Sequence, residues 1–274
     1  MNRRRTSIAS LAVALLALVV VVADAPANAQ FVRWLEVNPA ALDSADAGIH
    51  LLRGTRSGRS ARWLPLQRSA VAVLRFVGLE GERNLTDQIL EHQPRLVTLD
   101  PSILNQSPGW IVLDLQPQTR EWLPSRWRAF LAAEDLLGPA LPGWNQPAEQ
   151  LLHIRGHSSF KVLVHRPGGT RTEAVTKPVG QVLEIVLAAV PELLNGNLLP
   201  VRVLFRGQPL TSSHLLAANP ETGMELVVPI SAKGEAVVPL RSPGTWILSA
   251  TVVGPGDGTV DAEFFSTTAT IHRR

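Results

Sequence analysis

After residue 178 the chain alternates short apolar runs with turns, and this alternation constrains the fold more than any other feature. The runs have the length of β-strands and follow one another at intervals typical of an all-β sandwich. The turns contain Gly, Pro and Asn, which reverse a chain at little steric cost. Seven strands are expected, at residues 181–187, 201–205, 214–218, 224–230, 235–240, 245–253 and 264–272. The sequence thus predicts a seven-stranded sandwich over residues 178–274 with Trp246 inside.

The segment before Pro178 also contains short apolar runs, which we expect to be strands at residues 31–37, 61–67, 70–78, 95–100 and 110–116. One helix interrupts them. Ser125 is a suitable N-cap for it because its hydroxyl can accept from an amide of the first turn, and Gly138 supplies the end. Its apolar stripe consists of Trp127, Phe130, Leu131 and Leu137. A second short helix is predicted over residues 147–154. The fold class is therefore mainly β in two domains, a β-rich domain with one or two short helices over residues 30–177 and the sandwich over residues 178–274.

The first 29 residues have the pattern of a secretory signal peptide. Three arginines at positions 3–5 precede an uncharged run over residues 6–23, and Ala27 and Ala29 occupy the small-residue positions that a signal peptidase requires. We predict cleavage between Ala29 and Gln30. The alternative is a retained membrane anchor, because a span needs about 20 apolar residues. No second long apolar run follows, so the mature chain is expected to be soluble, without a membrane span, and periplasmic or secreted.

The charge balance argues against nucleic acid as a partner. Removal of the leader, with its three arginines and one aspartate, leaves 23 basic and 22 acidic residues. The sequence pI near 10.1 reflects the absence of Tyr and Cys, which leaves few groups to titrate between neutrality and that pI. The arginines are scattered, without a basic stripe or interleaved aromatic residues.

The chain contains no cysteine. Disulfides, thiolate chemistry and lipid attachment through an N-terminal Cys are therefore excluded. Buried apolar surface has to stabilise the fold, and the hydrophobic content of 45% can supply it.

Short motifs of the second half occur in the order found in a known family. They are Leu183-Glu184-Ile185-Val186, Gly207-Gln208-Pro209-Leu210, Gly244-Thr245-Trp246 and Ala269-Thr270. With them the chain resembles the bacterial family called domain of unknown function 4198, and Trp34-Leu35-Glu36 and Lys161 fit the family's earlier part. The resemblance implies export and a transthyretin-like C-terminal sandwich of immunoglobulin-like architecture. The family carries the label of a periplasmic component of nickel or cobalt uptake, and no established activity.

One departure from the family bears on metal binding. The resemblance implies that, in many members, cleavage of the signal peptide leaves a His about three residues before the Trp-Leu pair. A neutral imidazole at this place suits nickel or copper. This chain has Phe31 at that place. A nickel or cobalt role carried over from the family label therefore lacks its best ligand.

His153 and His157 in LLHIRGHSSFK stand four residues apart, the spacing that puts two imidazoles on one face of a helix. A zinc-type site needs three or four protein ligands, or a base as in H-E-x-x-H, but here Ile-Arg-Gly intervenes. Gly156 weakens a helix, and the run SFKVLVH indicates a strand whose polar face would carry His157, Lys161 and His165. Two interpretations stay open, metal ligands for nickel or cobalt and histidines of a surface or hinge.

The stretch Gly156-His157-Ser158-Ser159-Phe160 begins like the nucleophile elbow G-x-S-x-G of hydrolases. Phe160, however, occupies the position where a glycine must permit the sharp strand-to-helix turn. The sequence therefore predicts no hydrolase and no catalytic residue.

Acidic and aromatic residues suggest two further kinds of site. Asp257, Asp261 and Glu263 carry oxygen ligands suited to calcium, but they lack regular loop spacing and are expected to form a solvated turn. A sugar-stacking platform would need exposed indoles, whereas tryptophans in a domain of this size usually belong to the core. The tryptophans concerned are Trp63, Trp110, Trp122, Trp127 and Trp144.

These observations predict an exported, non-enzymatic binding or interaction protein of the cell envelope. Its partner would be an unidentified envelope protein or a small ligand, with no nucleic acid and no cofactor. The alternative is an accessory component of nickel or cobalt uptake, with His153 and His157 as metal ligands.

Overall fold

The computed structural model describes residues 31–37, 47–56, 61–100, 103, 108–136, 138, 140–165, 172–191, 197–211 and 213–273. Over these residues the protein is mainly β. The predicted signal peptide lies outside them, as does Leu137, and for Phe31 only the backbone is described.

The strands divide into those before and those after residue 178. The first group comprises β1 (Phe31–Val37), β2 (Gly48–Thr55), β3 (Arg62–Trp63), β4 (Val71–Gly78), β5 (Gly81–Asn84), β6 (Arg95–Thr98), β7 (Gly109–Leu115), β8 (Gln118–Trp122) and β9 (Leu152–Val164). The second comprises β10 (Leu183–Leu187), β11 (Leu198–Phe205), β12 (Gln208–Pro209), β13 (His214–Asn219), β14 (Met224–Pro229), β15 (Glu235–Pro239), β16 (Gly244–Pro255) and β17 (Ala262–Arg273). The α-helices are α2 (Pro124–Ala133) and α3 (Glu173–Thr176).

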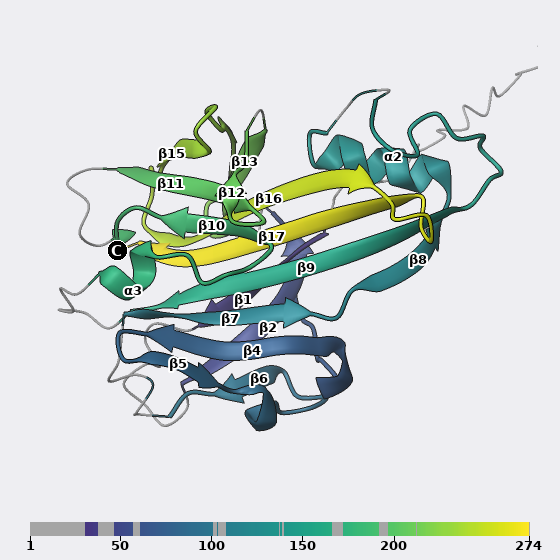
Figure 1. Cartoon of the computed structure of the whole chain (residues 1–274). Helices are drawn as coiled ribbons and strands as arrows, with labels where there is room; N and C mark the ends of the chain where they lie inside the picture. Colours follow the sequence, from purple (N-terminus) through teal and green to yellow (C-terminus); the bar gives the residue numbers. More distant parts are fainter. Residues whose placement is uncertain are drawn as a thin grey trace, which may run out of the picture.

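These strands form three sheets within the described residues (Figure 1). Sheet A contains β1, β2, β3 and β6, and sheet C contains β10, β11, β12 and β15. Sheet B runs in the order β14-β13-β16-β17-β9-β7-β4-β5, with β8 following β7 along the same edge of β9. β9 and β17 pair in parallel, Ile154 opposite Ala262 through Val162 opposite Thr270. This pairing joins the two halves of the chain in one sheet.

Sheet B is the central layer, because its two faces belong to different hydrophobic cores. Phe265, Ala269 and Ile271 of β17 pack into the core shared with sheet C. Phe160 and Val162 of β9 pack into the core shared with sheet A. Successive side chains of a strand point to opposite faces, so one set of strands serves both cores. Helix α2 covers the end of sheet B at which β8 lies (Figure 1).

All seven strands predicted after residue 178 are present, as β10, β11, β13, β14, β15, β16 and β17. Trp246 is fully buried, as expected, and its indole Nε1 donates to the Ser242 carbonyl oxygen at 2.9 Å. Trp110 and Leu163, from before residue 178, nevertheless belong to the same core. The two predicted domains thus share a sheet and a core, and the boundary at residue 178 stays a prediction.

The predicted helix is present, but its ends are not those expected. It begins at Pro124, and Leu123 is the N-cap, so Ser125 lies inside the first turn and caps nothing. Proline at the first helical position has the required φ and lacks only an amide that would be unpaired anyway. The helix ends at Ala133, before Gly138, while Trp127 and Leu131 are buried as predicted. No helix in the described residues has the length and apolar character of a membrane span.

The second predicted helix, over residues 147–154, is wrong, because these residues form turns that lead into β9 at Leu152. The strand predicted over residues 61–67 shrinks to the two residues of β3. Lys161 was expected on a polar strand face, yet its side chain is fully buried. Its partner Glu184 comes from β10, a contact that no local pattern reveals.

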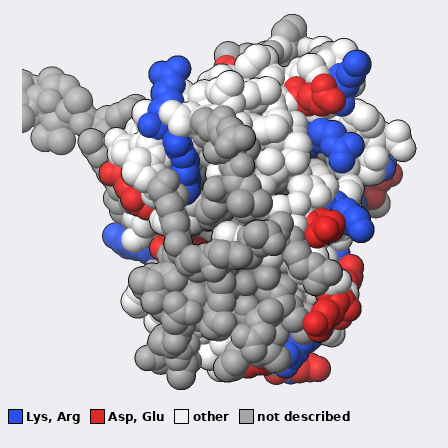
Figure 2. Space-filling model, turned by 90° about the vertical axis from the view of Figure 1, so that its left-hand side faces the viewer, with Lys and Arg blue, Asp and Glu red and all other residues white. Residues whose placement is uncertain are grey.

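The surface shown in Figure 2 carries both signs of charge. On the right-hand side of the view Lys and Arg side chains alternate with Asp and Glu, and at the upper left Lys and Arg atoms form a short column.

Candidate functional site

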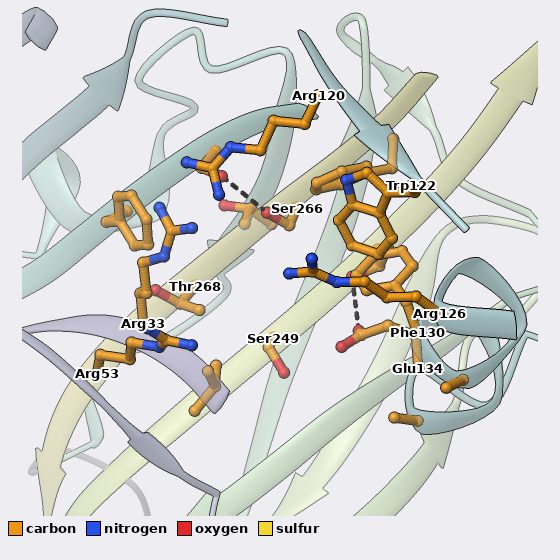
Figure 3. A pocket seen from close by; sticks show the side chains of 18 residues that line it. Arg33, Arg53, Arg120, Trp122, Arg126, Phe130, Glu134, Ser249, Ser266 and Thr268 are labelled. Atoms are coloured by element: carbon orange, nitrogen blue, oxygen red, sulfur yellow. Dashed lines mark hydrogen bonds between the residues drawn. The ribbon is translucent and has the colours of Figure 1, made fainter. Parts of the chain in front are cut away.

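A cavity of about 400 Å³ lies between sheet A, helix α2 and one face of sheet B. Its size falls within the range of about 300–1,000 Å³ typical of small-molecule sites. Figure 3 shows its walls. Arg33, Arg53 and Arg120 stand at one end, while Trp122, Phe130 and Glu134 stand at the other, with hydroxyl side chains between.

The arginine end is built by strand pairing. Arg33 of β1 and Arg53 of β2 are direct cross-strand partners, and Arg120 comes from β8 on the edge of sheet B. Like charges directly opposite each other destabilise a sheet. Burial, together with the charges of Arg120 and Arg53, lowers the pKa of Arg33 below its ordinary value. Three guanidinium groups are therefore concentrated at this end of the cavity.

Glu134 is the one acidic residue among the described residues that line the cavity. Its Oε1 accepts from Arg56 Nη2 at 2.6 Å, and its Oε2 accepts from Thr251 Oγ1 at 2.6 Å. Arg56 also donates to the Ala133 carbonyl oxygen at 2.9 Å. These contacts fix the end of α2 to sheets A and B. Both oxygens of the Glu134 carboxylate are therefore hydrogen-bonded, at the end of the cavity opposite Arg33.

The aromatic end consists of half-buried rings. The Trp122 and Phe130 centroids are 5.6 Å apart, and those of Phe130 and Phe264 are 4.8 Å apart. The Arg126 guanidinium lies 4.8 Å from the Trp122 ring centre. An indole held in this way offers a rigid apolar surface with a nearby positive charge.

The floor between the two ends is a row of hydroxyl side chains on β9, β16 and β17. They are Ser158, Ser249, Thr251, Ser266 and Thr268. Thr268 is 4% exposed, and its Oγ1 has no hydrogen-bond partner in the described part of the chain. The opposite face of β16 and β17 is apolar, with Leu248 and Phe265 in the core beneath. The floor is thus a polar part of sheet B, and the side chains on the other face of the same strands belong to a hydrophobic core.

The sequence reasoning missed this site. A signal existed in β16 and β17, where Ser249 and Thr251 stand two residues apart, as do Ser266 and Thr268, so that these four hydroxyls share a face. The arginines gave no such signal, because Arg33 and Arg53 meet only through the pairing of β1 with β2, and Arg120 joins them only where sheet A packs on sheet B.

His153 and His157 lie on strand β9 rather than on a helix. Four residues along a strand span about 13 Å, so the two imidazoles do not converge. His153 is exposed, with Nε2 3.7 Å from Glu121 and Nδ1 3.7 Å from Asp261. His157 stacks on Phe265 with ring centroids 4.3 Å apart. No group of three or more His, Asp or Glu in the described residues has the arrangement of a metal site.

The nucleophile-elbow pattern falls inside β9, where Ser158 is in mid-strand and accepts from Ser266 Oγ at 3.3 Å. No strand-to-helix turn presents this serine. Gly156 has a packing reason, since a Cβ atom there would lie 2.4 Å from the ring of Phe264.

The acidic residues near the last strand make internal contacts. Arg155 Nη1 donates to Asp257 at 2.6 Å and to Glu263 at 2.7 Å. Asp261 accepts from the backbone N–H of His153 at 2.7 Å. Hydrogen bonds from Thr259 and Arg155 lower the pKa of Asp257 below its ordinary value. These carboxylates fasten the turn before β17 to β9.

The tryptophans considered as a platform are dispersed. Trp110 and Trp127 are fully buried, whereas Trp63 is 58% exposed and stacks on His50. Trp122 lines the cavity.

The model of a protein family described as a domain of unknown function (DUF4198) matches residues 77–254. No curated protein and no solved structure matches the chain.

Proposed function

Because this chain belongs to the DUF4198 family, whose description assigns no activity, we propose its function from the cavity: it is a non-enzymatic binding protein of the cell envelope that holds a small anionic ligand. Arg33, partly buried and close to the charge of Arg120 at this end of the cavity, carries this proposal. A bound anion would offset the repulsion that Arg33 experiences from Arg120. Arginine also presents a planar fork that binds a carboxylate through two hydrogen bonds.

The lining residues support binding rather than catalysis. General acid–base catalysis uses a side chain that titrates near the working pH, most often His, or else Glu, Asp, Lys, Tyr or Cys. Among the described lining residues only Glu134 is of these types, and Arg56 and Thr251 engage both its oxygens. The cavity therefore offers recognition groups without an available proton carrier.

The envelope location rests on the signal-peptide pattern of residues 1–29. N-terminal sequencing of protein from an envelope fraction is expected to give Gln30 as the first residue. An intact Met1 on a membrane-bound product would contradict export in soluble form. We also propose that sheet C, with β13, β14, β16 and β17, forms the transthyretin-like sandwich implied by the family.

The proposal is tested by calorimetric titration of the purified protein with succinate and with inorganic sulfate. Saturable binding is expected at low ionic strength, weakened by sodium chloride, since salt screens partly exposed charges. Arg33→Gln should weaken binding about tenfold or more, because a hydrogen bond to a charged group contributes about 1.5–3 kcal/mol.

Arg241→Gln is the matched control, since Arg241 is exposed and does not line the cavity. It should bind like the wild type. Absence of binding by every anion, or an equal loss in both variants, would overturn the proposal.

A further inference from the structure

The cavity combines three recognition surfaces around one half-open space. Arg33, Arg53 and Arg120 stand at one end, half-buried rings with Arg126 beside them stand at the other, and the hydroxyl side chains of the floor lie between (Figure 3). Each hydroxyl can donate one hydrogen bond and accept others. A ligand that fills this space has to satisfy all three surfaces at once.

The hydroxyl floor restricts the middle of the ligand. Thr268 is almost fully buried and its hydroxyl lacks a partner in the described residues. Ser266 and Thr251 each donate one hydrogen bond inside the protein but retain acceptor capacity. An apolar ligand lying on this floor would leave the buried Thr268 hydroxyl without a partner and would remove water from the more accessible hydroxyls, which costs free energy. A polyhydroxylated ligand would exchange water for matching donors and acceptors.

The two ends restrict the remainder of the ligand. The guanidinium groups of Arg33 and Arg120 favour a carboxylate, for which arginine geometry is suited. Trp122 and Phe130 favour a flat or ring-shaped apolar face. A sugar ring has both an apolar C–H face and several hydroxyls.

Resting on the proposed function, we infer that the anion held in this cavity is an acidic saccharide, a small sugar that carries a carboxylate. The carboxylate lies against Arg33 and Arg120. The sugar hydroxyls bond to the floor that contains Ser249 and Thr268, and the C–H face of the ring packs on the aromatic end.

Titration calorimetry with three classes of probe tests this inference. Glucuronate and galacturonate combine carboxylate, ring and hydroxyls, glucose and galactose lack the charge, and benzoate lacks the hydroxyls. The uronates are expected to bind about tenfold more tightly than either of the other classes. This ratio corresponds to a difference of about 1.4 kcal/mol in binding free energy.

Two variants separate the contributions. Thr268→Val removes a hydroxyl that has no hydrogen-bond partner among the described residues, so folding should be preserved while uronate affinity falls several-fold and benzoate affinity is unchanged. Trp122→Leu should weaken uronate binding, and Trp63→Leu is the control because Trp63 is exposed and lies outside the cavity. Circular dichroism verifies that each variant is folded.

The outcomes distinguish this inference from the proposed function. Benzoate, succinate or sulfate binding as tightly as the uronates, with loss in Arg33→Gln, would overturn the saccharide and retain the anion site. Uronate binding that Thr268→Val leaves unchanged would also overturn it. Failure of every anion to bind would overturn both.

Discussion

Lys161 of β9 and Glu184 of β10 form an ion pair inside the protein, with Nζ 2.9 Å from Oε1 and both side chains buried. Glu184 also accepts from the backbone N–H groups of Val179 at 2.7 Å and Gly180 at 3.0 Å. The Lys161 ammonium lies 4.6 Å from the Trp110 ring centre. Sheets B and C are thereby linked by charges that water does not reach.

Lys161→Met should therefore destabilise the protein by about 3–5 kcal/mol, because it leaves the Glu184 carboxylate buried without its cation. Urea unfolding followed by tryptophan fluorescence measures the loss. The double variant Lys161→Met/Glu184→Gln should recover part of it, since both charges are then gone. A loss below about 0.5 kcal/mol in the single variant would contradict burial of the pair.

Two strand glycines provide a second prediction. At Gly156 an added Cβ would meet the ring of Phe264 at 2.4 Å, whereas at Gly254 no atom of the described residues would lie within 4 Å of it. Gly156→Ala should thus cost about 1–3 kcal/mol by overpacking, and Gly254→Ala should be close to neutral. Thermal unfolding compares the two variants directly. Equal effects of the two substitutions would contradict the predicted clash, because they would mean that the ring of Phe264 moves aside at little cost. If the clash is the cause of the loss, Phe264→Leu in the Gly156→Ala background should restore part of the stability.

The C-terminal strands could be predicted because each carries its own signal. A run of apolar residues and a turn with Gly, Pro or Asn define a strand locally, whatever it pairs with. The helical spacing of His153 and His157 was misleading for the same reason. Spacing of four is shared by one helix face and one strand face, and here the pairings of β9 with β8 and β17 decide for the strand.

The cavity could not be predicted in this way. Arg33, Arg120 and Thr268 are separated by long stretches of chain and meet only where β1, β8 and β17 surround one space. Lys161 was similarly placed on a polar face, because its burial depends on Glu184, a residue of another sheet. Non-local pairing, rather than residue pattern, determines both.

A third prediction concerns residues 178–274 as a separate fragment. In the whole chain β17 is paired to β9, and Trp110 and Leu163 fill the core that sheet C covers. The fragment lacks these contacts, so its urea midpoint should lie well below that of the full chain, which should unfold in one transition. A fragment as stable as the full chain would instead support an independent domain boundary at residue 178.

A fourth prediction follows from His157. Burial lowers its pKa below the ordinary 6.5, an effect opposed by Glu263 and reinforced by Arg155. The unfolded chain therefore binds a proton more readily than the folded one, so stability is fully present above pH 6.5 and decreases as the pH falls through the lowered pKa.

The variant His157→Gln lacks this proton linkage. The stability of this variant relative to the wild type should therefore increase as the pH is lowered from about 7.5 to about 5. Urea unfolding at both pH values measures this change. The same change at the exposed His153 is the control. A stability difference between His157→Gln and the wild type that stays constant with pH would contradict the assigned shift.

The final prediction concerns nickel and cobalt, the alternative ligands considered from the sequence. We expect binding in the millimolar range or weaker, for two reasons. Phe31 stands at the position where the family resemblance implies a histidine. In addition, strand β9 holds His153 and His157 about 13 Å apart. Two nitrogens bound to one ion at about 2.1 Å each cannot be more than about 4 Å apart. Titration calorimetry of the wild type and of His153→Ala/His157→Ala near neutral pH measures the affinity, and a repeat near pH 5 tests whether protonation competes with an imidazole ligand. Sub-micromolar binding that the double variant and acid both abolish would require β9 to rearrange around the ion and would restore the metal-uptake role.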